Sequence, residues 1–120
     1  MFRKRILYIQ VFHDHLMGRV VGEDRRVRRD CHALDNTRGD PDFSRIREAL
    51  RSLVEELAPG FSLRRPKALL HFIPEHYQPT QHQLELFKST AERSGISQCW
   101  LSKWETPNTD RELANVFRAL

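Results

Sequence analysis

The sequence predicts a single α/β domain over residues 1–120, built on a mixed five-stranded sheet with helices on both faces. Three observations predict it: three β-prone segments in the first third of the chain, an amphipathic helix after them, and alternating strands and capped helices in the rest. A chain of 120 residues, 39% apolar and 30% charged, has the size and composition of one folded domain.

The first third is expected to form an antiparallel meander. The nearly continuous apolar run at 6–11 is typical of a central strand that is covered on both faces. Polar, turn-prone residues at 13–15 and 22–24 separate this run from two further strands, expected at 16–21 and 25–34.

A helix is expected next, with Asp40 as its N-cap and Pro41 as its first residue, because proline has no amide hydrogen to lose there. Pro59 and Gly60 end it. Apolar residues at three- and four-residue steps predict one buried face: Phe43, Ile46, Leu50, Leu53, Val54 and Leu57.

The remaining chain predicts two strands and two helices. Segment 67–73 follows a helix, so it should pair in parallel with the first strand, and 98–102 is the fifth strand. Capping boxes open the two helices, with Thr80 and Gln83 in the first and Thr109 and Glu112 in the second. The first helix ends at Gly95, and the closing helix carries the apolar stripe Leu113, Val116, Phe117 and Leu120.

The expected sheet order is 3-2-1-4-5, with two helices on one face and the last helix on the other. The element order βββαβαβα is similar to that of ribonuclease-H-like and actin-like domains. The stretch 67–107 resembles the bacterial actin homologues that determine rod shape, through Thr90 to Ile96, the strand around Trp100, and Glu105-Thr106-Pro107. This resemblance implies half of an actin-like ATPase domain.

A second resemblance covers nearly the whole chain. The opening run 6–10, the helix at 43–59 and the capped helix near Thr80 resemble the small YjaA-type proteins of bacteria. That family is stress-related and has no established activity, so the resemblance implies a context without a mechanism.

The sequence lacks the residues with which actin-like ATPases hold phosphate. Their turn between the first two strands carries an Asp-x-Gly, whose glycine lets backbone amides approach the anion. Here the turn at 12–16 has bulky side chains, and the first glycine after it is Gly18. No glycine-rich nucleotide motif occurs elsewhere, so neither a nucleotide nor any other cofactor is expected.

The histidines and cysteines predict no catalytic residue and no metal ligand. His13 and His15, with Asp14 or Glu23, could hold a metal, but the sequence places no third ligand, and a solvated turn is the preferred interpretation. Cys31 and His32 are adjacent, and adjacent strand residues project to opposite faces, which argues against a nucleophilic pair. Cys31 and Cys99 are far apart in sequence and are expected to be free thiols.

Two sets of residues are candidate contact surfaces. Clustered arginines on the third strand can bind nucleic acid or an acidic protein, or can protect an exposed sheet edge: Arg25, Arg26, Arg28 and Arg29. Trp100 and Trp104 flank the end of the fifth strand, and either pack against the last helix or face a partner.

Together these features predict a non-enzymatic, stress-associated bacterial accessory protein that acts through a protein partner or self-association. A nucleic-acid-binding module using the arginine strand is an alternative that the net charge of +4 allows, and a degenerate nucleotide- or metal-binding protein is another. The apolar run at 6–11 is too short for a signal peptide or membrane helix, so a cytoplasmic location away from membranes is expected.

Overall fold

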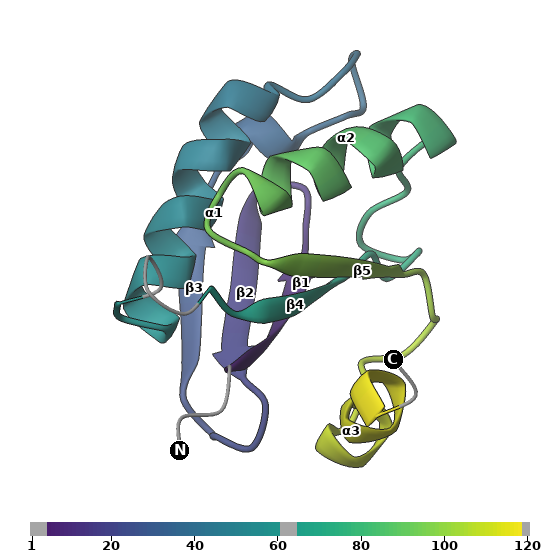
Figure 1. Cartoon of the computed structure of the whole chain (residues 1–120). Helices are drawn as coiled ribbons and strands as arrows, with labels where there is room; N and C mark the ends of the chain where they lie inside the picture. The colour runs from purple at the N-terminus through teal and green to yellow at the C-terminus, as the bar shows by residue number, and fades with distance from the viewer. Residues whose placement is uncertain (1–4, 61–64, 119–120) are drawn as a thin grey trace.

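The computed structural model describes residues 5–60 and 65–118 (Figure 1). The elements follow in the order β1 (Ile6–Val11), β2 (His15–Val20), β3 (Arg26–Asp30), the 3-10 helix η1 (His32–Leu34), α1 (Phe43–Leu57), β4 (Lys67–His71), α2 (Gln81–Glu92), β5 (Gln98–Ser102) and α3 (Asp110–Arg118).

The five strands form one mixed sheet in the order β3-β2-β1-β4-β5, which confirms the predicted sheet order. β2 pairs antiparallel with both β1 and β3, as the meander requires. β4 pairs in parallel with β1 and with β5, so the strand after the first helix lies where it was expected. β3 and β5 are the two edges of the sheet.

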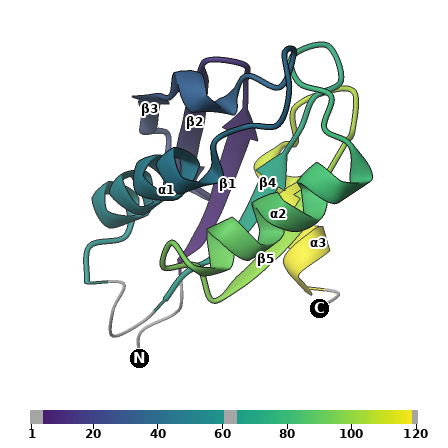
Figure 2. The ribbon, with the colours of Figure 1, turned by 90° about the horizontal axis from the view of Figure 1, so that it is seen from above.

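Alternating side chains give the sheet two different faces. Leu7, Ile9 and Val11 of β1 join the larger apolar core, which α1 and α2 cover. Tyr8 lies between them in sequence and points to the opposite face, where it packs with Leu69 and with Leu113 of α3. Figures 1 and 2 show α1 and α2 on one side of the sheet and α3 on the other.

Helix α1 begins two residues later than the sequence predicts, because Asp42 rather than Asp40 is the N-cap. The Asp42 Oδ1 accepts hydrogen bonds from the backbone N–H groups of Ser44, at 3.1 Å, and Arg45, at 3.4 Å. Asp40 lies in the preceding loop and accepts a hydrogen bond from Gln83 Nε2 at 3.0 Å. Pro41 is buried in the same loop and is not the first helical residue.

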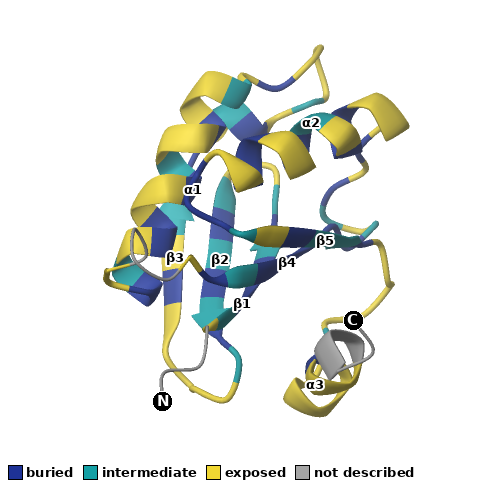
Figure 3. Ribbon diagram, viewed as in Figure 1, coloured by how far each residue is buried: buried dark blue, intermediate teal, exposed yellow. Residues whose placement is uncertain are grey.

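The predicted apolar face of α1 is confirmed. Five of its residues are buried against the sheet, namely Ile46, Leu50, Leu53, Val54 and Leu57, and Phe43 packs partly buried beside them. In Figure 3 the outer side of α1 is exposed and its inner side is buried.

The third strand is shorter than the predicted segment 25–34. It ends at Asp30, which lies opposite His15, the first residue of β2, so β2 offers no further strand residue to pair with. The Cys31 N–H donates to the carbonyl of Asp14, at 2.8 Å, and the chain then turns into η1. This turn brings Leu34 into the main core, where it is fully buried. β4 likewise ends at His71, before the predicted limit of 73.

Both predicted capping boxes are confirmed. In the first, Gln83 N donates to Thr80 Oγ1 and Thr80 N donates to Gln83 Oε1, each at 3.1 Å. In the second, Glu112 N donates to Thr109 Oγ1 at 3.2 Å and Thr109 N donates to Glu112 Oε1 at 3.1 Å. α2 ends at Glu92, and the chain reverses through Gly95, which has a φ of 102°.

Only part of the apolar stripe predicted for the closing helix lies within the described residues. Leu113 is fully buried, whereas the side chains of Val116 and Phe117, and all of Leu120, lie outside the described part of the molecule. Within the described ranges, no helix has the length and apolar character needed to cross a membrane.

Gly18, in the middle of β2, marks the closest approach of α1 to the sheet. A Cβ at this position would lie 3.0 Å from a methyl carbon of Leu53 and 3.0 Å from one of Leu57. The absence of a side chain therefore lets the helix lie directly on the strand.

Replacing Gly18 with alanine is expected to lower the free energy of unfolding by about 1–3 kcal/mol, because the added methyl overpacks the helix–sheet contact. Urea denaturation measures this loss. In the Gly18→Ala/Leu57→Ala double variant, the combined loss should be smaller than the sum of the single losses, since both changes act on one contact. Simple additivity would contradict the proposed close approach.

Candidate functional site

A buried chain of hydrogen bonds lies on the face of the sheet that α3 covers. The hydroxyl of Tyr8, on β1, lies 2.6 Å from His71 Nδ1, on β4, and both residues are buried. His71 Nε2 lies 3.0 Å from the backbone carbonyl of Trp104, and the Asn108 backbone N–H donates to the Tyr8 hydroxyl at 3.0 Å. Three distant parts of the sequence therefore meet at one point.

The partners fix the tautomer of His71. A carbonyl only accepts hydrogen bonds, so the hydrogen of a neutral ring lies on Nε2 and points to Trp104, and Nδ1 accepts from Tyr8. Burial lowers the pKa of His71, and the Trp104 carbonyl and the charge of Glu112 oppose that shift. Burial also raises the pKa of Tyr8, which keeps its hydroxyl able to donate.

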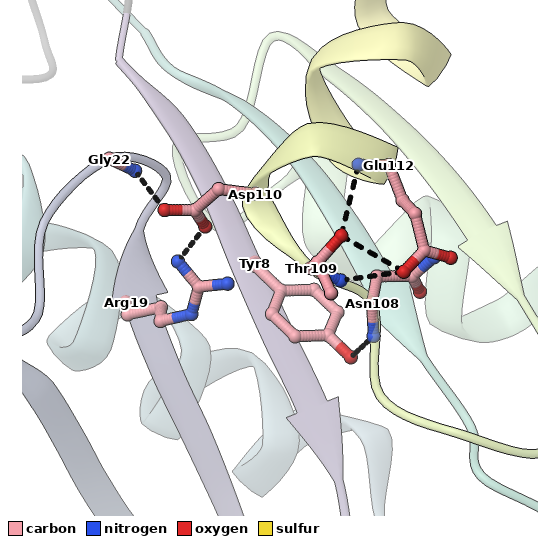
Figure 4. Close-up of polar contacts among 7 residues, drawn as sticks. All are labelled: Tyr8, Arg19, Gly22, Asn108, Thr109, Asp110 and Glu112. Carbon is pink, nitrogen blue, oxygen red and sulfur yellow. Dashed lines mark hydrogen bonds and ion pairs between the residues drawn. The ribbon is translucent and has the colours of Figure 1, made fainter.

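Electrostatic contacts hold the first turn of α3 over the same face (Figure 4). Asp110 accepts a hydrogen bond from Arg19 Nη1, on β2, and another from the Gly22 backbone N–H at 3.2 Å. The Arg19 guanidinium lies 5.3 Å from the centre of the Tyr8 ring. The Arg19 side chain is only 13% exposed, so its charge is largely withdrawn from water.

A cavity of about 150 Å³ lies beside this contact. Residues of β1, β2, β3 and the segment before α3 line it: Tyr8, Gln10, Met17, Gly18, Arg19, Arg26, Pro107 and Asn108. Arg26 lies directly opposite Arg19 in the β2–β3 register. The Asn108 Oδ1 is buried without a hydrogen-bond partner.

The four arginines of the predicted strip do not share one surface. Arg25 and Arg29 lie on the α1 side, where both form ion pairs with Glu56, and the hydrogen bond from Arg29 lowers the pKa of that carboxyl. Arg28 lies on the opposite face and pairs with Asp30 at 2.8 Å. Within residues 5–60 and 65–118, Arg26 has no carboxylate partner.

The two tryptophans also occupy different environments. Trp100 is half-buried and packs against the apolar cluster beneath α3. Trp104 is 69% exposed and is the exposed large apolar side chain of the described residues. Its backbone is nevertheless fixed, because its carbonyl accepts from His71 and its N–H donates to Ser102 Oγ at 3.4 Å.

The histidines near the first turn have local partners. His15 Nδ1 lies 2.6 Å from Asp14 Oδ1, and its ring stacks on Phe12 with centroids 4.3 Å apart. The His13 ring lies 5.4 Å from the Tyr77 ring. No group of three histidine, cysteine or acidic residues in the described ranges could hold a metal ion.

Cys31 and Cys99 are free and buried. Burial raises the pKa of the Cys31 thiol and raises that of Cys99 to about 12, so both remain protonated at neutral pH. Cys31 lies after β3 rather than within a strand, so the argument from strand alternation does not apply to it, and burial is what keeps its thiol protonated.

No protein-family model matches the chain, and no curated protein matches it. The geometry of the α3 face therefore carries the functional interpretation. Sequence reasoning missed Tyr8, His71 and Asn108. The available signal was that Tyr8 lies within the apolar run of β1 and that His71 directly follows the apolar run of β4.

The stability of the protein is expected to fall as the pH drops below about 6.5, the ordinary pKa of histidine. The unfolded chain takes up a proton on His71 in this range, while the folded protein, with its lowered pKa, does not. Thermal unfolding at a series of pH values measures the effect.

The matched variant is His71→Gln, which cannot titrate. It should be less stable than the wild type above about pH 7, and its stability should change less between that pH and about pH 5.5. An equally steep pH dependence in both proteins would show that His71 is not the titrating group.

Proposed function

We propose that the protein is a non-enzymatic accessory domain that binds an extended segment of a partner protein along β5, with Trp104 as the anchoring side chain. The observation that carries the proposal is the 69% exposure of Trp104 two residues beyond an edge strand. Buried tryptophan side chains contribute strongly to protein interfaces, so an exposed one on an anchored backbone favours a binding role.

The two edges of the sheet differ in a way that supports this assignment. Along the β3 edge, four of five residues are charged, namely Arg26, Arg28, Arg29 and Asp30, and such charges discourage pairing with another strand. β5 carries no charged residue between Gln98 and Ser102. β4 is its one neighbouring strand, so the other edge of β5 has no strand partner in the sheet. An added strand would extend the sheet there.

The fixed backbone of Trp104 favours binding energetically. Its carbonyl is held by the buried His71, and the following chain is held by the bond from Asn108 to Tyr8. A side chain presented from an ordered backbone loses less conformational entropy on binding than one on a mobile loop. The loop thus presents a preorganised anchor.

The wider proposal is a cytoplasmic, stress-associated bacterial factor on an actin-like or ribonuclease-H-like half domain. The sheet order 3-2-1-4-5 supports that fold assignment, and the resemblance to YjaA-type proteins supports the context. A non-enzymatic role is favoured because Cys31 and Cys99 are protonated and the β1–β2 turn carries Phe12 stacked on His15 in place of a glycine phosphate turn.

Selection of extended peptides from a displayed random library, followed by affinity measurement, tests the proposal. Selected peptides should bind Trp104→Ala about tenfold or more weakly than the wild type, which is the loss expected for an interface anchor. Glu105→Ala, a change at the exposed neighbour in the same loop, should leave affinity nearly unchanged.

The edge itself is tested by placing a charge on it. Gln98→Lys should weaken peptide binding, whereas Gln81→Lys, the same change at an exposed position of α2, should not. Amide hydrogen exchange should slow at β5 when peptide binds. Protection confined to another element, or selected peptides insensitive to Trp104, would contradict the proposal. A concentration-dependent dimer protected at β5 would replace the foreign partner with a second copy of the chain.

A further inference from the structure

We propose that the cavity between Arg19, Arg26 and Asn108 is a binding site for a phosphate group, either the free ion or a small phosphate monoester. The cavity lies on the α3 face, away from the outer edge of β5, so the inference does not rest on the proposed partner interface.

The first observation is an unbalanced pair of positive charges. Arg19 and Arg26 are directly opposite each other on β2 and β3, and like charges in that register repel. Asp110 neutralises Arg19 alone, and no carboxylate in the described ranges pairs with Arg26. One additional negative charge between the two guanidinium groups would balance them, and planar guanidinium groups suit the oxygens of a phosphate.

The second observation is the unsatisfied acceptor of Asn108. Asn108 lines the same cavity. Its Oδ1 is buried and accepts no hydrogen bond from the described residues. Buried polar atoms are nearly always hydrogen-bonded, so a bound group whose donor reaches this oxygen would satisfy it. A ligand that suits both features carries a negative charge and a hydrogen-bond donor within one small group.

A protonated phosphate meets both requirements. Its charged oxygens can accept from Arg19 and Arg26 while its hydroxyl donates to Asn108 Oδ1. Sulfate has the same shape and is a fully deprotonated anion at neutral pH, so it offers no donor to that oxygen. A cavity of about 150 Å³ admits a tetrahedral oxyanion and leaves no room for a large ligand.

The other arginines near β3 do not contribute to this cavity. Arg28, two residues along the same face of β3, is paired with Asp30 and does not line the cavity. Arg25 and Arg29 are held by Glu56 on the other side of the sheet. The affinity for phosphate should therefore depend on Arg26 and not on the other arginines of β3.

Calorimetric titration with sodium phosphate, methyl phosphate and sodium sulfate at equal ionic strength tests the inference, near pH 6.5 so that a large share of the phosphate carries a proton. We expect saturable binding of phosphate, about tenfold weaker binding of sulfate, and a rise in melting temperature with phosphate, as for any ligand of the folded state. Tighter binding of methyl phosphate would assign the site to an ester, and tighter binding of inorganic phosphate would assign it to the free ion.

Three variants locate the site. Arg26→Gln should weaken phosphate binding about tenfold, and Arg28→Gln, its control on the same strand and face, should change it less than about twofold. Asn108→Ala should remove the preference for phosphate over sulfate. Absence of saturable binding, equal binding of both anions by the wild type, or equal losses in Arg26→Gln and Arg28→Gln would overturn the inference.

Discussion

The pair formed by Tyr8 and His71 is the interaction on which the α3 face depends. Both side chains are polar, and both are buried between a sheet and a helix, where an unpaired polar group is costly. Besides the hydrogen bond between them, each has a second partner on the segment between β5 and α3, which supplies Trp104 O to His71 and Asn108 N to Tyr8. The pair therefore requires that segment to follow one path. Along that path lie the exposed Trp104 side chain at one end and the Asn108 wall of the cavity at the other.

Ion pairs differ between the two faces of the sheet. On the α1 side of β3, Glu56 forms ion pairs with Arg25 and Arg29. On the α3 side, Asp110 draws Arg19 over the Tyr8 ring and fixes the first turn of the helix. The arginine cluster at 25–29 is thus divided between the two faces of the sheet, because successive strand residues point in opposite directions. The two proposed activities lie on separate parts of the molecule.

Much of the fold could be predicted from local sequence signals, because periodicity and capping are local properties. The apolar steps of α1 and the capping boxes at Thr80 and Thr109 are examples. Errors arose where a distant contact decided the outcome. β3 ends early because its partner strand β2 begins at His15, opposite Asp30, and Asp42 is the N-cap of α1 while Asp40 accepts a hydrogen bond from Gln83. The site depends on pairs up to 100 residues apart, such as Tyr8 and Asn108, which no local pattern reveals.

The Tyr8→Phe variant tests the central claim most directly, because it removes one hydroxyl and keeps the ring that packs beneath Arg19. Amide hydrogen exchange, resolved by residue, should accelerate about tenfold or more at Asn108 and along segment 103–108, with little change in α1, as expected for loss of a local anchor. Affinity for both phosphate and selected peptides should fall in the same variant. Unchanged exchange in segment 103–108 would show that the Tyr8 hydroxyl does not hold the segment, and would contradict the account.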